Sequence, residues 1–286
     1  MALVATIGFF DGVHCGHQFV LENVVSIAAS KHLTPAVVVF KDHPQRVLYG
    51  RSIPLLTTYD ERLQLLKAFG VEQILTFSFE KICHLTAEEF MRLLHDEHDV
   101  SVLVMGYDHH FGSNHPDSFE RYQESADRVG IELVRLPRNP ISKASSTAIR
   151  KAISLGNIEE ANDMLGYHFT LTGKVVSGKQ IGRKIGFPTA NLLIPEEKIV
   201  PMDGVYICET DDRKALLNIG SNPTLNGTER TIELHIPDFS GDLYGKTLSV
   251  QLLHYLRSEQ LFDNLDALQH QIAQDVEQIK HNISAE

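Results

Sequence analysis

Apolar and polar positions divide this chain into two regions with different patterns. Up to about residue 165, short apolar runs alternate with segments whose apolar residues recur every three or four positions. The runs predict buried strands and the segments predict helices: strands at 3–10, 35–40, 72–79, 100–108 and 131–136, helices at 17–30, 57–69 and 87–98. This alternation predicts a parallel sheet covered by helices on both faces. Ligands of such sheets bind at the carboxyl ends of the strands.

The pattern changes after about residue 165. Short runs of alternating character follow one another closely, separated by Gly, Pro, Asn and Asp. Closely spaced strands of this kind predict a small antiparallel barrel or sandwich. We therefore expect an α/β domain over 1–165 and a second domain, a small antiparallel β-barrel, over 166–286.

The C-terminal segment predicts a long amphipathic helix from Ser258 to about residue 283. Its apolar residues recur at steps of three and four and form one stripe: Phe262, Leu265, Leu268, Ile272, Val276, Ile279 and Ile283. Ser258 is the expected N-cap. Packing against the barrel accounts for this stripe without a cofactor.

Length and composition agree with two folded domains. The chain has 286 residues, of which 43% are hydrophobic, and a formal net charge of -11. The apolar content excludes a largely disordered chain. The negative charge argues against broad binding to a nucleic-acid backbone, although a local group of donors can still hold a small polyanion. We therefore expect small-molecule ligands and no nucleic-acid partner.

The cysteines and the lengths of the apolar runs bear on the cell compartment. Cys15, Cys83 and Cys208 are odd in number and far apart, which excludes a disulfide framework and favours a reducing cytoplasm. No apolar run approaches the roughly 18–20 residues that cross a bilayer, and the first residues lack the features of a secretory signal. We expect a cytoplasmic protein with no membrane partner and no obligate protein partner.

The loop after the first predicted strand, GFFDGVHCGH (8–17), has the features of a phosphate site. Gly12 and Gly16 let the backbone approach a ligand closely, and the following helix start offers free N–H groups. His14 and His17 are three apart, so both rings can face one side and donate hydrogen bonds to a phosphate under attack. Two alternatives remain, a metal site that lacks obvious further ligands and a pair of ordinary surface histidines.

A second segment with phosphate-binding residue types precedes another predicted helix. Ser146 and Thr147 place hydroxyls at the helix start, and Arg150 follows within about one turn. Hydroxyls at this position commonly cap a helix, and the nearby guanidinium favours a second phosphate clamp. Asp108 lies just past a predicted strand, at the edge where ligands bind.

GRKIGFPTANL (182–192) is the first distinctive motif of the second region. Gly182, Arg183 and Gly186 combine permissive backbone with positive charge, which predicts a phosphate-binding loop. Pro188 fixes the entry into an extended stretch. The alternative is a bulge or turn in which Pro and Asn have purely local roles.

Three oxygen-bearing side chains of the second region are candidates for a catalytic site. Thr189 and Asn191 are two apart in an extended stretch and point the same way, and their oxygens suit a Mg²⁺ ion that also binds the phosphates of a nucleotide. In TIELHI (231–236), the period of two places Glu233 on the face opposite the apolar residues. Glu233 is a candidate base for an attacking substrate hydroxyl, or else a solvated strand residue.

One further motif is rejected as a nucleotide site. Gly241–Thr247 is similar to the phosphate loop of NTPases, but its glycines are one residue too close and no helix follows. We predict a hairpin turn there.

The ordered set of motifs resembles that of the bacterial bifunctional riboflavin kinase/FMN adenylyltransferases, often called FAD synthetases. GFFDGVHCGH and SSTAIR are similar to the two nucleotide-binding signatures of the first half, and GRKIGFPTANL, IELHI, DLYG and LRSEQLF to motifs of the kinase half. The resemblance implies a Rossmann-like nucleotidyltransferase domain over 1–165, which moves AMP from ATP onto FMN and releases pyrophosphate. It implies a riboflavin kinase domain over 166–286, which uses ATP and Mg²⁺ to make FMN.

The resemblance also implies roles for individual residues. His14 and His17 would be catalytic residues that hold the ATP phosphates of the first site, and Glu233 the catalytic base of the second. Residues implied to bind nucleotide or flavin are Gly8, Phe9, Asp11, Asp108, Ser146, Thr147 and Arg150 in the first site, and Gly182, Arg183, Gly186, Pro188, Thr189, Asn191 and Arg257 in the second. Thr189 and Asn191 would also contact the Mg²⁺ ion.

The chain departs from the family pattern at two places in its first half. Phe9 stands where many members have Asn, and Ser113–Asp117 replaces a segment in which many members carry basic and glycine residues. These departures leave open a riboflavin kinase whose N-terminal domain is weak or inactive. The HCGH motif also leaves open an aminoacyl-tRNA synthetase, and the two phosphate-binding patterns would equally suit a flavin- or nucleotide-sensing protein without catalysis.

Overall fold

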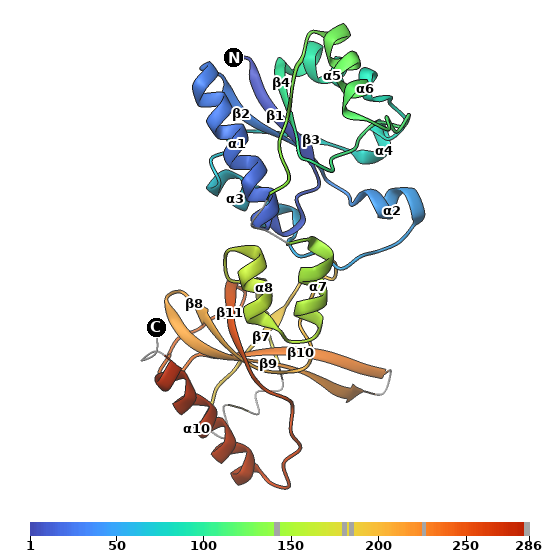
Figure 1. Cartoon of the computed structure of the whole chain (residues 1–286). Coiled ribbons are helices and arrows are strands. Elements are labelled where there is room, and N and C mark those ends of the chain that lie inside the picture. The colour runs from blue at the N-terminus through green and yellow to red at the C-terminus, as the bar shows by residue number, and fades with distance from the viewer. Residues whose placement is uncertain (140–143, 179–181, 183–185, 225–226, 283–286) are drawn as a thin grey trace. The chain divides into compact units, whose positions relative to one another are not determined.

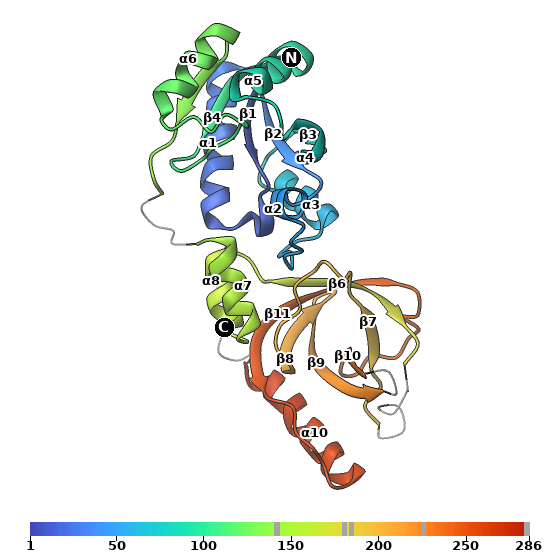
Figure 2. The same cartoon turned by 90° about the vertical axis from the view of Figure 1, so that its right-hand side faces the viewer.

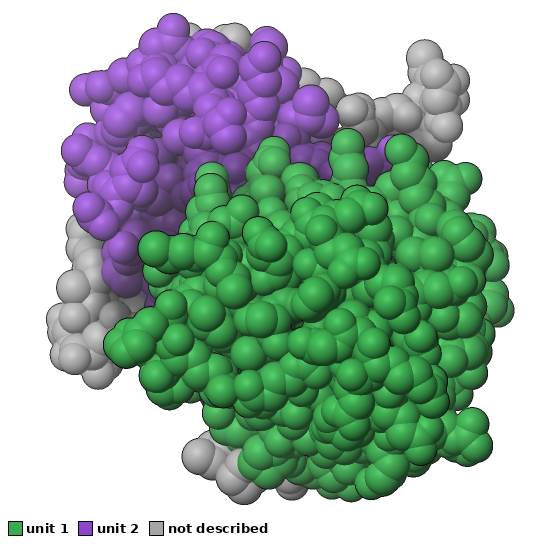
Figure 3. Space-filling model, turned by 90° about the horizontal axis from the view of Figure 1, so that it is seen from above, with its two compact units in different colours: residues 1–146 green, residues 147–286 purple. Residues whose placement is uncertain are grey.

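The computed structural model describes residues 1–139, 144–178, 182, 186–224 and 227–282. The chain forms two compact units, Met1–Ser146 and Thr147–Glu286, which have different colours in Figure 3. Each unit has its own sheet and its own core, so each is described by itself.

Unit 1 is built on a five-stranded sheet in which all neighbouring strands are parallel (Figure 1). The strand order is β3-β2-β1-β4-β5. The strands are β1 Leu3–Gly8, β2 Thr34–Phe40, β3 Gln73–Phe77, β4 Val100–Met105 and β5 Glu132–Arg135. The chain runs outward from β1 to β3 and then returns to place β4 on the other side of β1. The loops after β1 and β4 therefore flank a topological switch point, where ligands of such sheets bind.

Helices cover both faces of this sheet, as the sequence predicts. Alternate residues of β2 point to opposite faces: Val37 and Val39 pack with Leu21 and Leu66 of α1 and α3, whereas Val38 packs with residues of α5 and α6. The helical elements are η1 Asp11–Val13, α1 Cys15–Lys31, α2 Pro44–Tyr49, α3 Tyr59–Ala68, α4 Phe79–Ile82, α5 Ala87–His98 and α6 Phe119–Val129. The predicted α/β architecture is confirmed.

Unit 2 contains a closed antiparallel barrel with strand order β10-β7-β6-β11-β8-β9 (Figure 2). The strands are β6 Thr170–Val176, β7 Ala190–Leu193, β8 Gly204–Thr210, β9 Arg213–Thr224, β10 Gly227–His235 and β11 Thr247–Arg257. The predicted small barrel is confirmed. The predicted hairpin at Gly241–Thr247 is wrong, because β10 pairs with β7 and β9 while β11 pairs with β6 and β8. That segment instead connects two strands that are not neighbours.

The described residues of the second half also form the helices α7 Ser146–Ser154, α8 Ile158–Leu165 and α10 Leu265–Asn282. Ile279 of α10 packs with Val205 and Leu216 on the barrel. The predicted start of this helix at Ser258 is wrong. The helix begins at Leu265, where the side chain of Asn264 accepts a hydrogen bond from Ala267 N (2.9 Å), so the cap lies six residues later than predicted and 258–264 is a loop.

In the described part of the chain, no helix combines the length and the apolar character needed to span a membrane.

Candidate active sites

The first candidate site is a cavity of about 920 Å³ at the carboxyl ends of β1 and β4. Its wall brings together five residues that the sequence predicts to bind a nucleotide. Gly8 ends β1, Asp108 follows β4, His14 and His17 lie at the start of α1, and Ser146 lies at the end of unit 1. The cavity therefore occupies the switch point of the parallel sheet.

The two histidines form a stacked pair. Their ring centroids are 3.7 Å apart, with an angle of 18° between the planes. His14 Nδ1 accepts a hydrogen bond from Gly16 N (3.2 Å), so the proton of the neutral ring lies on Nε2. A Cβ atom at Gly16 would lie 3.1 Å from His14 Cε1, which explains why glycine occupies this position. The prediction that both rings face the same side is confirmed.

His17 is held in its neutral form. Burial of the ring, and secondly the neighbouring His14, lower the pKa of His17 well below its ordinary value. Its Nδ1 atom is buried and has no hydrogen-bond partner among the described residues. At neutral pH His17 therefore presents an uncharged imidazole, which can donate one N–H to an anionic oxygen.

The loop between β1 and α1 is anchored to the segment before α3. The carboxylate of Asp11 accepts hydrogen bonds from Leu56 N (3.1 Å), Thr57 N (3.0 Å) and Thr57 Oγ1 (3.2 Å). The hydroxyl of Ser146 donates to Asp11 O (3.0 Å). These contacts fix the backbone that carries the two imidazoles.

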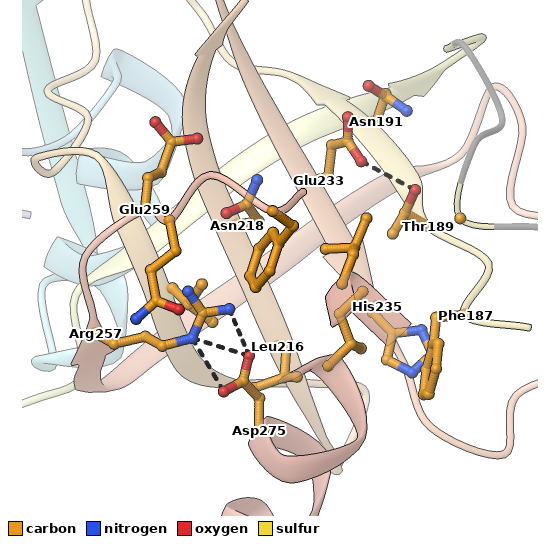
Figure 4. A pocket seen from close by; sticks show the side chains of 16 residues that line it. Phe187, Thr189, Asn191, Leu216, Asn218, Glu233, His235, Arg257, Glu259 and Asp275 are labelled. Atoms are coloured by element: carbon orange, nitrogen blue, oxygen red, sulfur yellow. Dashed lines mark hydrogen bonds and ion pairs between the residues drawn. The ribbon is translucent and has the colours of Figure 1, made fainter. Parts of the chain in front are cut away.

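The second candidate site is a cavity of about 360 Å³ that α10 and barrel strands both line (Figure 4). Thr189 Oγ1 donates a hydrogen bond to Glu233 Oε2 (3.2 Å). Asn191 stands opposite Glu233 in the β7–β10 ladder. The structure thus brings the predicted hydroxyl, amide and carboxylate together at one end of the cavity.

A third cavity, of about 650 Å³, meets the second at Thr189, which lines both. Glu233 lines the second cavity, whereas Leu234 and Ile236 line the third. These alternating residues point to opposite faces of β10. Thr189 is the lining residue that the two cavities share, and its hydroxyl donates to Glu233.

Arg257 and Asp275 close the other end of the second cavity with an ion pair (Figure 4). Arg257 Nε lies 3.0 Å from Asp275 Oδ1, and Nη2 lies 2.7 Å from Oδ2. Gln271 Nε2 donates to the same carboxylate (2.9 Å). Because Asp275 is buried, this pair ties the end of β11 firmly to α10.

Comparison with known proteins gives two family matches, one to each half of the chain. The FAD synthetase family matches residues 1–148, and the riboflavin kinase family matches residues 165–283. The bifunctional riboflavin kinase/FMN adenylyltransferase of Escherichia coli K12 is 34% identical over 282 residues, covering 95% of this chain and 90% of the relative. The protein of the same name from Haemophilus influenzae is 33% identical over 285 residues, covering 96% and 92%.

This chain belongs to the bifunctional riboflavin kinase/FMN adenylyltransferase family. The residues that line the first cavity lie within the range 1–148 that matches the FAD synthetase family. The residues that line both barrel cavities lie within the range 165–283 that matches the riboflavin kinase family. A crystal structure described as a macrolide-efflux protein from Streptococcus pneumoniae has a TM-score of 0.88 at 33% identity, covering 98% of this chain and 94% of that chain. That name describes the other protein; the likeness shows that its fold is shared.

Other predicted residues of this family member lie in different surroundings. Phe9 and Asp11 are not among the described residues that line the first cavity, and a direct part in binding stays a prediction. Thr147 and Arg150 belong to unit 2, so their part in the first site also stays a prediction. Residues 140–143, which precede the predicted clamp, lie outside the described residues.

The predicted phosphate loop of the kinase half is described in part. Gly182 lines the second cavity, Pro188 lines the third, and Gly186 is exposed with a φ of 83°. Pro188 O accepts a hydrogen bond from His235 Nδ1 (2.9 Å). Arg183 lies outside the described residues.

Sequence reasoning missed several residues that line these cavities. His109 lines the first cavity, and burial, together with His110, lowers its pKa to about 4; its position directly after Asp108 was a usable signal. Asp275 carried no local signal, because its partner Arg257 lies in another element. Tyr244 of the rejected motif lines the third cavity, so that segment has a place in a site although it is no NTPase phosphate loop.

Proposed function

We propose that this chain makes FMN from riboflavin and ATP at the barrel, and then FAD from FMN and a second ATP at the parallel sheet. One observation carries this proposal: the residues that match each family line a cavity of their own, and each cavity has polar side chains that can bind phosphate or a phosphate-bound ion. The alternative with an inactive N-terminal half has less support, because the stacked imidazoles stand intact at the switch point.

The kinase reaction uses both barrel cavities. Riboflavin fits the second cavity, whose wall includes the apolar side chains of Phe262, Leu268 and Ile272, and ATP fits the third. The terminal hydroxyl of riboflavin then meets the γ-phosphate at the point where Thr189 lines both cavities. This arrangement supplies the proximity that a bimolecular phosphoryl transfer needs.

Glu233 acts as the general base of this reaction. Its carboxylate takes the proton of the riboflavin hydroxyl while the hydroxyl oxygen attacks the γ-phosphorus, and the bond to the bridging oxygen breaks to release ADP. The hydroxyl of Thr189 donates to the carboxylate. This hydrogen bond orients the carboxylate of Glu233.

The donor set at this end of the cavity fits Mg²⁺, which prefers oxygen ligands and retains several waters. Thr189 and Asn191 would hold the ion together with the ATP phosphates, and the ion would neutralise phosphate charge. The described residues contain no group of three or more His, Cys, Asp or Glu side chains that could hold a metal alone. An ion bound jointly by the protein and the ATP phosphates therefore fits these residues better than an ion bound by protein side chains alone.

Adenylyl transfer uses the first cavity. An oxygen of the FMN phosphate attacks the α-phosphorus of ATP, a new P–O–P bond forms, and pyrophosphate leaves. His14 Nε2–H and the neutral ring of His17 donate hydrogen bonds to phosphate oxygens as their charge grows. Ser146, which lines this cavity, extends the phosphate clamp, and the SSTAIR motif adds Thr147 and Arg150 as candidates for it. No protein nucleophile takes part.

None of the three cysteines forms a disulfide, which fits a reducing cytoplasm, and we place both reactions there with small molecules as the ligands.

A chromatographic time course of the purified chain with riboflavin, ATP and Mg²⁺ tests the proposal. We expect FMN to appear first and FAD to follow, both to stop on addition of EDTA, and both to resume with excess Mg²⁺. Absence of FMN would contradict the kinase assignment. FMN without FAD, even from supplied FMN, would contradict the assignment of the first half.

A further inference from the structure

Arg62 is a buried cation outside both candidate sites. It lies on α3 with none of its surface exposed, and its guanidinium carbon is 4.0 Å from the centre of the Phe9 ring. Its Nη2 atom donates to Phe40 O at the end of β2 (3.0 Å). Its Nε and Nη1 atoms are buried and have no hydrogen-bond partner among the residues that the structure describes.

Stability does not explain an arginine at this position. Burial lowers the pKa of Arg62 to about 10, although nearby Asp11 favours the charged form, so the side chain is still charged at neutral pH. A buried charge with unmet donors destabilises a folded protein, and an apolar side chain of similar volume is often neutral or stabilising in its place. The charge of Arg62 therefore serves something besides the packing of the core.

The loop that Arg62 contacts has a strained backbone. Phe10 and Val13 have φ angles of 55° and 35°, in the left-handed region that side chains other than glycine rarely adopt. Such conformations persist where the surroundings hold them in place. The carboxylate of Asp11 supplies one anchor, and the ring of Phe9 on Arg62 supplies another.

The contact between Arg62 and the Phe9 ring lies next to residues that line the first cavity. Gly8 and Phe10 both line that cavity, and Phe9 stands between them with its ring on the guanidinium. The ring of Phe10 in turn meets the ring of His17 edge to face, with centroids 5.2 Å apart. A continuous chain of contacts thus runs from Arg62 to the stacked imidazoles.

We propose that Arg62 is a positioning residue for adenylyl transfer. Its cation holds the Phe9 ring, and through it the strained loop, so that His14 and His17 keep their orientation toward the ATP phosphates. The proposal rests on the proposed function of the first site. The Arg62–Phe9 pair would hold the loop that carries the two histidines without itself lining the cavity.

Two substitutions separate this role from core packing. Arg62→Met keeps the volume and removes the charge, and Arg62→Lys keeps the charge. With supplied FMN and ATP, we expect Arg62→Met to lower kcat for FAD formation by about 30-fold, the scale of a desolvated cation–π contact. Its melting temperature should be equal to or above that of the wild type, and Arg62→Lys should recover most of the rate.

A double-mutant cycle and the second active site supply the controls. Phe9→Leu should lower the rate as Arg62→Met does, and the double variant should be no slower than either, because both remove the same contact. FMN formation from riboflavin should stay at the wild-type rate in every variant. A wild-type rate of FAD formation in Arg62→Met, or a loss that only follows a lower melting temperature and is shared by Arg62→Lys, would overturn the proposal.

A second readout keeps this test independent of the proposed function. The imidazole C–H resonances of His14 and His17, assigned by alanine substitution, should shift in Arg62→Met and stay near their wild-type positions in Arg62→Lys. Unchanged resonances in Arg62→Met would overturn the positioning role. Failure of the proposed function would instead appear as a wild-type chain that forms no FAD.

Discussion

Thr189 lines both barrel cavities, and its hydroxyl donates a hydrogen bond to the predicted base Glu233. Thr189→Val removes the hydroxyl while keeping the shape of the side chain, so Glu233 loses its donor. Because a hydrogen bond to a charged group contributes about 1.5–3 kcal/mol, we expect FMN formation to slow by about 10- to 100-fold.

Thr189→Ser is the matched control, since it restores a hydroxyl at the same position. We expect it to retain most of the rate of FMN formation, measured by chromatography of the flavins. Equal rates for Thr189→Val and the wild type would show that the contact with Glu233 has no part in the reaction.

The depressed pKa of His109 predicts how stability depends on pH. Its pKa is about 4 in the folded protein and about 6.5 in an unfolded chain, so between these values the unfolded state binds a proton that the folded state does not. Stability therefore falls as the pH is lowered through this window. His109→Asn removes the effect, and its melting temperature should fall less than that of the wild type between pH 6.5 and pH 4.5.

Parallel pH dependences of the melting temperature in the two proteins would contradict this prediction. Carboxylates titrate in the same pH range in both proteins. The test therefore compares the change in melting temperature of His109→Asn with that of the wild type.

At the scale of elements, the Arg257–Asp275 pair ties β11 to α10 across the cavity that we assign to riboflavin. Asp275→Ala breaks this tie and leaves the guanidinium unpaired, and removing one partner of a buried pair costs about 3–5 kcal/mol. We expect a lower melting temperature and a riboflavin KM raised by about tenfold, with FAD formation from supplied FMN unchanged.

Asp266→Ala, at an exposed position in the first turn of the same helix, should leave the riboflavin KM at its wild-type value. Exchange of the two charges, Arg257→Asp with Asp275→Arg, should restore part of the lost affinity. A wild-type KM in Asp275→Ala would show that the pair does not shape the flavin cavity.

The elements also show what the sequence could predict. Periodicity predicts the five parallel strands and the barrel, because burial on one or both faces leaves a local pattern. Periodicity also predicts that the last helix begins at Ser258, because Phe262 continues the apolar stripe. In the structure the side chain of Asn264 caps the helix, which begins at Leu265, and Phe262 lines the second cavity. Local spacing cannot distinguish these two uses of an apolar residue.

The sequence identifies individual site residues but not the contacts between distant segments. Motif spacing predicts Thr189, Asn191 and Glu233 as site residues, whereas their closeness in space depends on the pairing of β7 with β10. The anchoring of Asp11 by Leu56 and Thr57 depends on segments 45 and 46 residues away, and no local pattern indicates it.

At the scale of the whole molecule, the limits of the second half can be tested with fragments. The predicted boundary lies after residue 165, whereas compact unit 2 begins at Thr147 and includes nearly all of α7 and the whole of α8. Asn162 of α8 donates to Leu252 O (2.9 Å) and accepts from Phe169 N (2.7 Å). We expect a fragment of residues 147–286 to melt at a higher temperature than one of residues 166–286, since each lost hydrogen bond costs about 1 kcal/mol.

Both fragments should be assayed for FMN formation, with the full chain as reference. Equal melting temperatures and equal rates would show that α7 and α8 add nothing to the barrel, and would favour the boundary after residue 165.

Complementation between two variants tests directly whether this chain holds two separate ATP-dependent sites. With riboflavin, ATP and Mg²⁺, His17→Ala should accumulate FMN without FAD, and Glu233→Gln should form neither product yet convert supplied FMN to FAD. A mixture of the two variants should make FAD from riboflavin through released FMN. Loss of both activities through either single substitution, or FAD formation from riboflavin by either variant alone at the wild-type rate, would contradict the assignment of two separate sites.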